Sequence, residues 1–166
     1  NRVFGNLSGS LGFEYSPSNI HTLKMNVGRS FRYPGANELA SNGLHHGAFR
    51  HEQGNGDLSS ERGYQLDIDY HYEKGSFNVR LNPFLSWFKN YIYLEPTGSW
   101  SVLPHAGQIY RYNESEAIVA GGELMAGYNI SNRLSVNGDV EYVFNRNIAD
   151  NYALPFTPPT VVTTDI

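Results

Sequence analysis

YQLDIDYHYE, residues 64–73, places an apolar or aromatic side chain at every second position and a polar one in between. In a β-strand successive side chains point to opposite faces, so this stretch has one apolar face and one polar face. In a helix, at about 100° per residue, the same apolar residues would fall on two opposite sides and could not be buried together. The stretch therefore predicts a two-faced β-strand.

The same alternation recurs along the chain and predicts an all-β protein with antiparallel, up-and-down strands. Six strands form three hairpins and cover about residues 3–15, 21–32, 59–73, 76–94, 110–130 and 134–145, with the start of a seventh after Pro159. Connections of two or three residues alternate with long ones at about residues 33–58, 95–108 and 146–159. All long loops therefore leave one rim of the sheet and all tight turns leave the other, as in outer-membrane barrels.

A two-residue turn at Lys74 and Gly75 predicts the pairing of the third and fourth strands. Residues whose numbers sum to 149 would then face each other, which joins the apolar positions of the two strands and sets Asp69 opposite Arg80 on the polar face. Pro83 lacks the N–H group that a ladder needs, so a bulge or bend is expected there.

The composition excludes several classes of protein. A net charge of -4 offers no basic surface for nucleic acid, and zero cysteines leave no disulfide, thiolate metal site or cysteine nucleophile. No segment approaches the roughly 18 to 20 apolar residues of a membrane helix. The mean hydropathy of -0.45 is compatible with a membrane barrel, whose wall is apolar only at alternate positions. The chain starts at Asn1 without a methionine, which indicates a piece of a longer protein.

Strand length and aromatic placement favour a wall between lipid and water. The predicted strands exceed the roughly 9 to 11 residues that cross a bilayer, and aromatic side chains gather near strand ends, as two interfacial belts would require. Trp87, Tyr91 and Tyr93 would form the belt towards the long loops. The alternative is a soluble β-sandwich or lipocalin-like ligand-binding module, in which the same apolar face packs inward.

The first long loop carries a resemblance to a known family. Arg32-Tyr33-Pro34 ends one strand and is followed by Glu38-Leu39, a polar stretch, and a Leu58-x-x-Glu61 start of the next strand. This order resembles the late barrel region of TonB-dependent outer-membrane receptors. Similar motifs follow at Phe88-Lys89-Asn90-Tyr91-Ile92, at Gly122-Glu123 and at Leu154-Pro155-Phe156-Thr157-Pro158-Pro159, so the resemblance covers nearly the whole chain in the expected order.

This resemblance implies that residues 1–166 are one partial domain of a 22-stranded transmembrane β-barrel, with the plug domain absent from this piece. It implies an outer-membrane location in a Gram-negative bacterium, in contact with lipid. The whole receptor would capture a scarce nutrient, such as a ferric siderophore, haem or a metal chelate, and import it with TonB-type energy coupling through the plug. The resemblance does not choose among these cargoes.

The longest loop also contains the residues most suited to binding cargo. His45, His46 and His51 with the carboxylate of Glu52 are plausible ligands for zinc, copper or iron, or contacts for a haem edge. Such a metal site would need three or four ligands to converge, and a solvated histidine cluster is the simpler interpretation. Trp100, in the second long loop, could stack on a flat cargo.

Other polar residues are expected to support the structure. Within the resemblance, Arg32, Pro34, Glu38 and Glu61 would brace the first long loop, and Asp69 with Arg80 would stabilise the wall. The carboxylates of Glu123, Asp139 and Glu141 could line a cation path, but solvated wall groups are the simpler interpretation.

Motifs of enzymes are missing from the chain. It contains no Gly-x-Ser-x-Gly elbow, phosphate-binding glycine loop or His-Glu-x-x-His pair, so catalysis is not expected and no cofactor is predicted.

Overall fold

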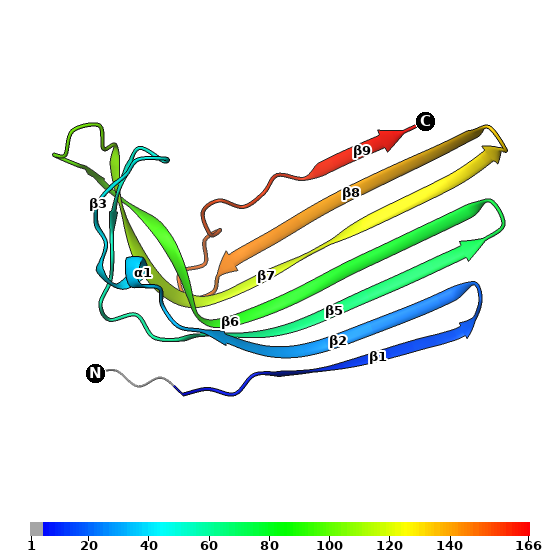
Figure 1. The fold of residues 1–166 in the computed structure, drawn as a ribbon, viewed down its shortest axis with the longest axis horizontal. Coiled ribbons are helices and arrows are strands. Elements are labelled where there is room, and N and C mark those ends of the chain that lie inside the picture. The colour runs from blue at the N-terminus through cyan, green and yellow to red at the C-terminus, as the bar shows by residue number, and fades with distance from the viewer. Residues whose placement is uncertain (1–4) are drawn as a thin grey trace.

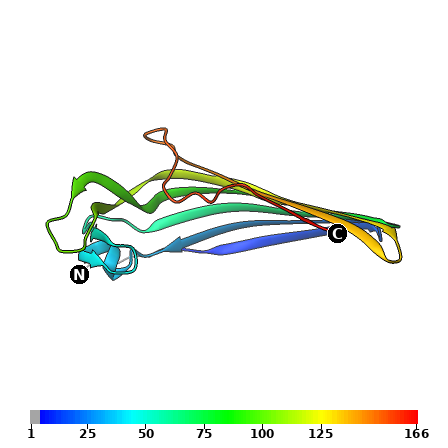
Figure 2. The ribbon, with the colours of Figure 1, turned by 90° about the horizontal axis from the view of Figure 1, so that it is seen from above.

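A computed structural model describes residues 5–166 as one open, single-layered sheet, antiparallel except for one short parallel pair (Figures 1 and 2). One short helix interrupts the succession of strands. The elements are β1 (Gly9–Ser18), β2 (His21–Arg32), α1 (Ala36–Ala40), β3 (Asn42–His45), β4 (Arg50–Gln53), β5 (Glu61–Lys74), β6 (Phe77–Trp100), β7 (Gln108–Ser131), β8 (Leu134–Asn147) and β9 (Val161–Asp165).

The predicted fold class is confirmed, and Figure 1 shows the long loops at one end of the sheet and the tight turns at the other. Some strand limits differ from the prediction. β1 begins at Gly9, and the predicted start at Val3 lies outside the described residues. β6 continues to Trp100, where it pairs with Gln108, so the second loop is shorter than predicted.

The first long loop, predicted as a connection at about residues 33–58, contains regular structure that the sequence analysis did not predict, namely α1 and the β3–β4 hairpin. β4 pairs in parallel with β7, and the strand order is β1-β2-β5-β6-β7-β4-β3. β8 pairs with the part of β7 that β4 leaves free, and β9 pairs with β8. Two loops distant in sequence therefore meet at one end of the sheet.

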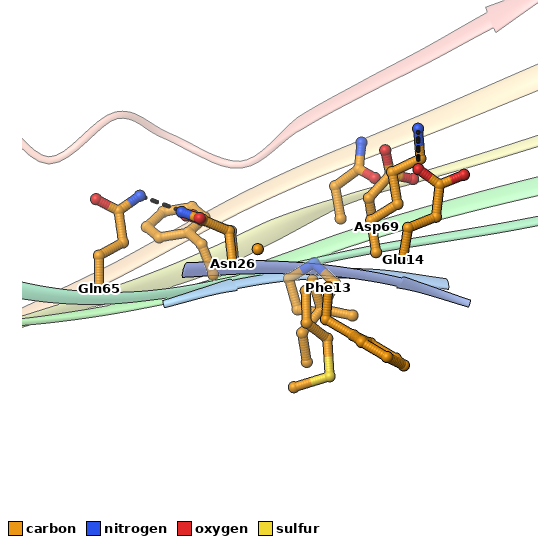
Figure 3. Close-up of a pocket in the computed structure, with 13 residues that line it drawn as sticks. Phe13, Glu14, Asn26, Gln65 and Asp69 are labelled. Carbon is orange, nitrogen blue, oxygen red and sulfur yellow. Dashed lines mark hydrogen bonds and ion pairs between the residues drawn. The ribbon is translucent and has the colours of Figure 1, made fainter. Parts of the chain in front are cut away.

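The two faces of the sheet differ sharply in chemistry. Phe13 lies on one face, and Glu14, Asn26 and Asp69 lie on the other (Figure 3). The side chains of the apolar face are open to solvent, and Leu11 has 79% of its surface exposed. Among the described residues no helix is long and apolar enough to cross a membrane.

The predicted register of β5 and β6 is wrong, because the tight turn lies one residue later in the chain than predicted. The turn residues are Gly75 and Ser76, and facing residues sum to 151 rather than 149. Gly75 has φ +60, which glycine adopts without a steric penalty. Arg80 therefore faces His71, yet its guanidinium still reaches Asp69 diagonally, with 2.7 Å between Nη2 and Oδ2.

No bulge occurs at Pro83, which stands opposite Gly122 of β7 in an unshifted register. A Cβ atom at Gly122 would lie 3.0 Å from the Cα of Pro83, so the glycine gives the proline room within the sheet. The expected bulge at this position is therefore wrong.

A bulge does occur higher in β6, between Phe88 and Tyr91, where Asn90 has φ +58. The extra residue reverses which side chains of β6 face outward. Tyr91 and Tyr93, predicted for the outer aromatic belt, instead pack with Leu154 in a small core.

This bulge divides the molecule into two parts. We call residues 32–61, 89–116 and 147–160 the rim, and the remaining described strand residues the wall. The buried hydrophobic side chains lie in the rim or at its border, and they are Leu58, Ile92, Tyr93, Leu94, Ala117 and Leu154.

Candidate functional site: the loop rim

His51 lies in β4 and is buried, with 9% of its surface exposed. Both ring nitrogens are engaged: Nδ1 is 2.8 Å from the Ser101 hydroxyl, and Nε2 is 2.9 Å from the side-chain oxygen of Asn42. The imidazole therefore connects the first long loop to the second. It has no free nitrogen to offer a ligand in this arrangement.

Glu52 is also buried and fully engaged. One carboxylate oxygen accepts hydrogen bonds from Arg50 at 2.8 Å, and the other accepts the Tyr112 hydroxyl at 3.2 Å. Burial and then the negative charge of Glu52 raise the pKa of Tyr112, because both disfavour the phenolate. The Arg50 guanidinium further lies 5.3 Å from the centre of the Tyr110 ring. Glu52 thus fixes β4 against β7.

His45 and His46 differ from His51 because both are exposed near the tip of the β3–β4 hairpin. The structure does not bring the three histidines together as ligands. In residues 5–166 the only set of three or more histidine or carboxylate groups with ligand atoms within 4.8 Å of one another is Glu123, Asp139 and Glu141.

Trp100 ends β6 with 75% of its surface exposed. The β6–β7 turn beyond it touches the β3–β4 hairpin, since the Gly107 amide donates to the Phe49 carbonyl at 2.8 Å. A Cβ atom at Gly107 would lie only 2.9 Å from that carbonyl, so this close approach requires glycine. Phe49 is 69% exposed, and the two hairpin tips therefore present aromatic surface to solvent.

Arg32 connects the end of β2 to the first long loop and to β5. Its guanidinium donates to Glu38 at 2.8 Å and to Glu61 at 3.2 Å. Glu38 also accepts the Gly35 amide at 2.7 Å, and Glu61 accepts the buried Ile92 amide at 2.9 Å. Burial lowers the pKa of Arg32, but the two carboxylates outweigh it and leave that pKa raised.

Arg32, Glu38 and Glu61, which we call the Arg32 cluster, therefore link the end of β2, the first long loop and the start of β5 close to the β6 bulge. Pro34, between β2 and α1, is buried in this region. The four residues expected to brace the loop thus lie together or close by, and their contribution to stability stays a prediction.

Asn147 was not identified from the sequence, although its side chain is fully buried. It donates to the Tyr93 hydroxyl and to Asp150, and it accepts a hydrogen bond from Ser115 at 2.8 Å. Burial, followed by the contact with Tyr152, raises the pKa of Tyr93. An asparagine among other loop residues gives no sequence signal of this role.

The carboxylates of Glu123, Asp139 and Glu141 lie on the polar face of the wall, below the rim. Glu123 and Glu141 are directly paired across β7 and β8, and Glu123 accepts a hydrogen bond from Asn82 at 3.3 Å. This acidic cluster is separate from the loop residues and faces the same side as the Asp69–Arg80 ion pair.

Comparison with known proteins gives a consistent result. Residues 1–165 match the family model described as "TonB dependent receptor-like, beta-barrel". No curated protein matches the chain.

Solved structures with similar folds include the copper transporter OprC, which is 21% identical with a TM-score of 0.75 over 92% of this chain and 22% of that one. The siderophore receptor PirA from Acinetobacter baumannii is 20% identical, with a TM-score of 0.66 over 96% of this chain and 26% of that one. A mutant of the ferric enterobactin receptor PfeA from Pseudomonas aeruginosa is 20% identical, with a TM-score of 0.68 over 96% of this chain and 25% of that one. The chain thus spans about a quarter of the length of these proteins.

Proposed function

Because the chain belongs to the TonB-dependent receptor β-barrel family, we propose that it is part of the wall and outer rim of a nutrient receptor in the outer membrane of a Gram-negative bacterium. The intact receptor captures a ferric siderophore, haem or a metal chelate and imports it. Import uses TonB-type energy coupling, which reaches the receptor through a plug domain outside this piece.

One observation carries the proposal, namely that the sheet exposes its entire apolar face. Leu11, Leu81, Leu124 and Val140 are each at least 39% exposed, and no second layer covers them within residues 5–166 (Figure 2). Exposed rows of this kind are stable only against hydrocarbon or another apolar surface. A closed soluble sandwich or lipocalin-like module, which would bury the same rows, finds no support.

The rim is proposed to face the cell exterior, because long loops project outward in outer-membrane barrels. Trp100 and the two exposed histidines, His45 and His46, are the candidates for cargo contact. His51 and Glu52 support this site indirectly by holding β4 against β7 and the second loop.

Titration of the intact receptor with zinc, haem and a ferric siderophore tests the cargo site. A double alanine variant of the exposed His45 and His46 should lose affinity for the true cargo by roughly tenfold, and Trp100→Ala should weaken the binding of a flat ligand. His21→Ala, at the opposite end of β2, is the control. Unchanged affinity of the double variant for all three probes would refute the histidine proposal.

A second experiment tests the transport proposal. Removing the inner-membrane energy-coupling protein from the host should abolish cargo uptake while leaving surface binding intact. Uptake that continues without it would contradict the proposed mechanism of import.

A further inference from the structure

The outward face of the sheet carries an aromatic and basic row at the border between wall and rim. Arg29, Tyr64 and Trp87 are direct partners on β2, β5 and β6. The Arg29 guanidinium lies 5.7 Å from the centre of the Tyr64 ring, and the Tyr64 and Trp87 rings stack at 5.2 Å. Aromatic side chains in this position mark the interface between hydrocarbon and lipid headgroups.

Two further cations lie one step beyond this row. Arg62 is two residues from Tyr64 on β5 and so shares its outward face, and Lys89 shares that face because it is the direct partner of Arg62 in the β5–β6 ladder. They stand directly opposite each other on β5 and β6. Like charges in facing positions of adjacent strands destabilise a sheet unless a counter-charge lies near them.

Within residues 5–166 no such counter-charge accompanies this pair. In the part of the chain that the structure describes, neither Arg62 nor Lys89 has a carboxylate within 4 Å, and the buried Nε of Arg62 has no hydrogen-bond acceptor. Glu114 and Glu116 of β7 share this face near the bulge, but both are engaged elsewhere: Glu116 accepts the indole N–H of Trp87 at 2.8 Å, and Glu114 accepts the Ser59 amide at 2.6 Å. Buried donors without partners are rare, so this arrangement points to an external anion.

We propose that Arg62 and Lys89 bind a phosphate group of an outer-leaflet glycolipid. Guanidinium and ammonium groups together suit a phosphate, and their place just beyond the Tyr64–Trp87 pair matches the depth of a headgroup rather than of the acyl chains. The inference rests on the proposed membrane placement and adds a specific lipid contact to it.

The test uses the intact receptor in detergent and measures lipid affinity by native mass spectrometry. The probes are lipid A with two phosphates, the same lipid with both phosphates removed, and inorganic phosphate as a competitor. The site variant is Arg62→Gln with Lys89→Gln. The control, Lys74→Gln with Arg133→Gln, removes the same charge at the tight-turn end of the sheet.

The site variant should bind phosphorylated lipid A at least about tenfold more weakly than the unchanged receptor, and the control should stay within about twofold. The lipid without phosphates should bind both variants equally. An equal loss in site variant and control, or no loss in either, would overturn the proposal. Displacement of the lipid by millimolar inorganic phosphate would assign the site to a free anion and would also overturn it.

A single variant and the behaviour of the unchanged receptor separate a folding defect from the loss of a lipid site. If the double variant does not fold, Lys89→Gln alone should weaken lipid A binding severalfold against Lys74→Gln, because the Lys89 side chain is exposed. If the unchanged receptor binds neither form of lipid A, the membrane placement itself is wrong. Binding of both forms without any effect of the substitutions refutes only the phosphate site.

Discussion

The wall and the rim share the long strands β6 and β7 but differ in which side chains are buried. In the wall, leucine, valine and aromatic rows are exposed and polar groups pair across the other face. In the rim, apolar side chains and charged groups such as Glu61 are buried together in a network of loops. β6 belongs to the wall before its bulge and to the rim after it. A single strand can thus expose an apolar face along one part and bury apolar side chains beneath loops along another.

A charge placed on the apolar side of the wall, which we propose faces lipid, should have the largest effect on this comparison. Leu124 faces Leu81 about halfway along the wall, and Leu124→Arg should cost roughly 2–4 kcal/mol of folding free energy in a bilayer. Urea titration of the intact receptor folded into vesicles measures this cost. Met125→Arg is the matched control, since the neighbouring side chain points to the polar face near Asp139.

A cost for Met125→Arg equal to that of Leu124→Arg would mean that neither face meets lipid. That outcome would contradict the assignment of the wall to the membrane.

The rim should behave as a separate cooperative unit. Asn147→Ala removes buried hydrogen bonds to Tyr93, Ser115 and Asp150 and should weaken the loop by about 1–3 kcal/mol. Hydrogen exchange of the intact receptor should become faster in residues 147–158 and stay unchanged in the wall. Asn137→Ala, on the polar face of β8 at the tight-turn end, is the control; faster exchange throughout the sheet would show that rim and wall unfold together.

Much of the wall could be predicted from alternation alone, and the reason for the error in the β5–β6 register is physical. With a turn at Lys74–Gly75 the numbers of two facing residues sum to 149, and with a turn at Gly75–Ser76 they sum to 151. Both registers keep every apolar side chain on the same face, so the hydrophobic pattern cannot decide between them. Only the conformation of Gly75 at the observed turn distinguishes the two.

The rim could be predicted only in part. The sequence indicated that Arg32, Glu38 and Glu61 belong together because family motifs contain them. It could not show the β3–β4 hairpin, whose strands of four residues are too short for a clear period. Nor could it show that both ring nitrogens of His51 would be hydrogen-bonded, one to Asn42 and one to Ser101, which are 9 and 50 residues away.

A conservative change in the Arg32 cluster should have an intermediate effect. Glu61→Gln keeps the shape of the side chain but removes the charge that pairs with Arg32 and accepts the Ile92 amide. We expect a loss of about 1–2 kcal/mol, confined to the rim, because a charged acceptor is replaced by a neutral one. Local exchange at Ile92 and in α1 measures it, and protection equal to the unchanged receptor would show that the cluster does not brace the loop.

The matching change in the wall should have almost no effect. Asp69→Asn also removes a carboxylate from an arginine, here Arg80, but this ion pair lies on the open polar face, with 51% of the arginine side chain exposed. Water and salt already solvate both groups, so an exposed pair adds little to stability. The urea midpoint of the folded receptor should therefore not change measurably at physiological salt. A loss as large as that of Glu61→Gln would mean that the polar face is covered in the intact receptor and that Asp69 is buried there.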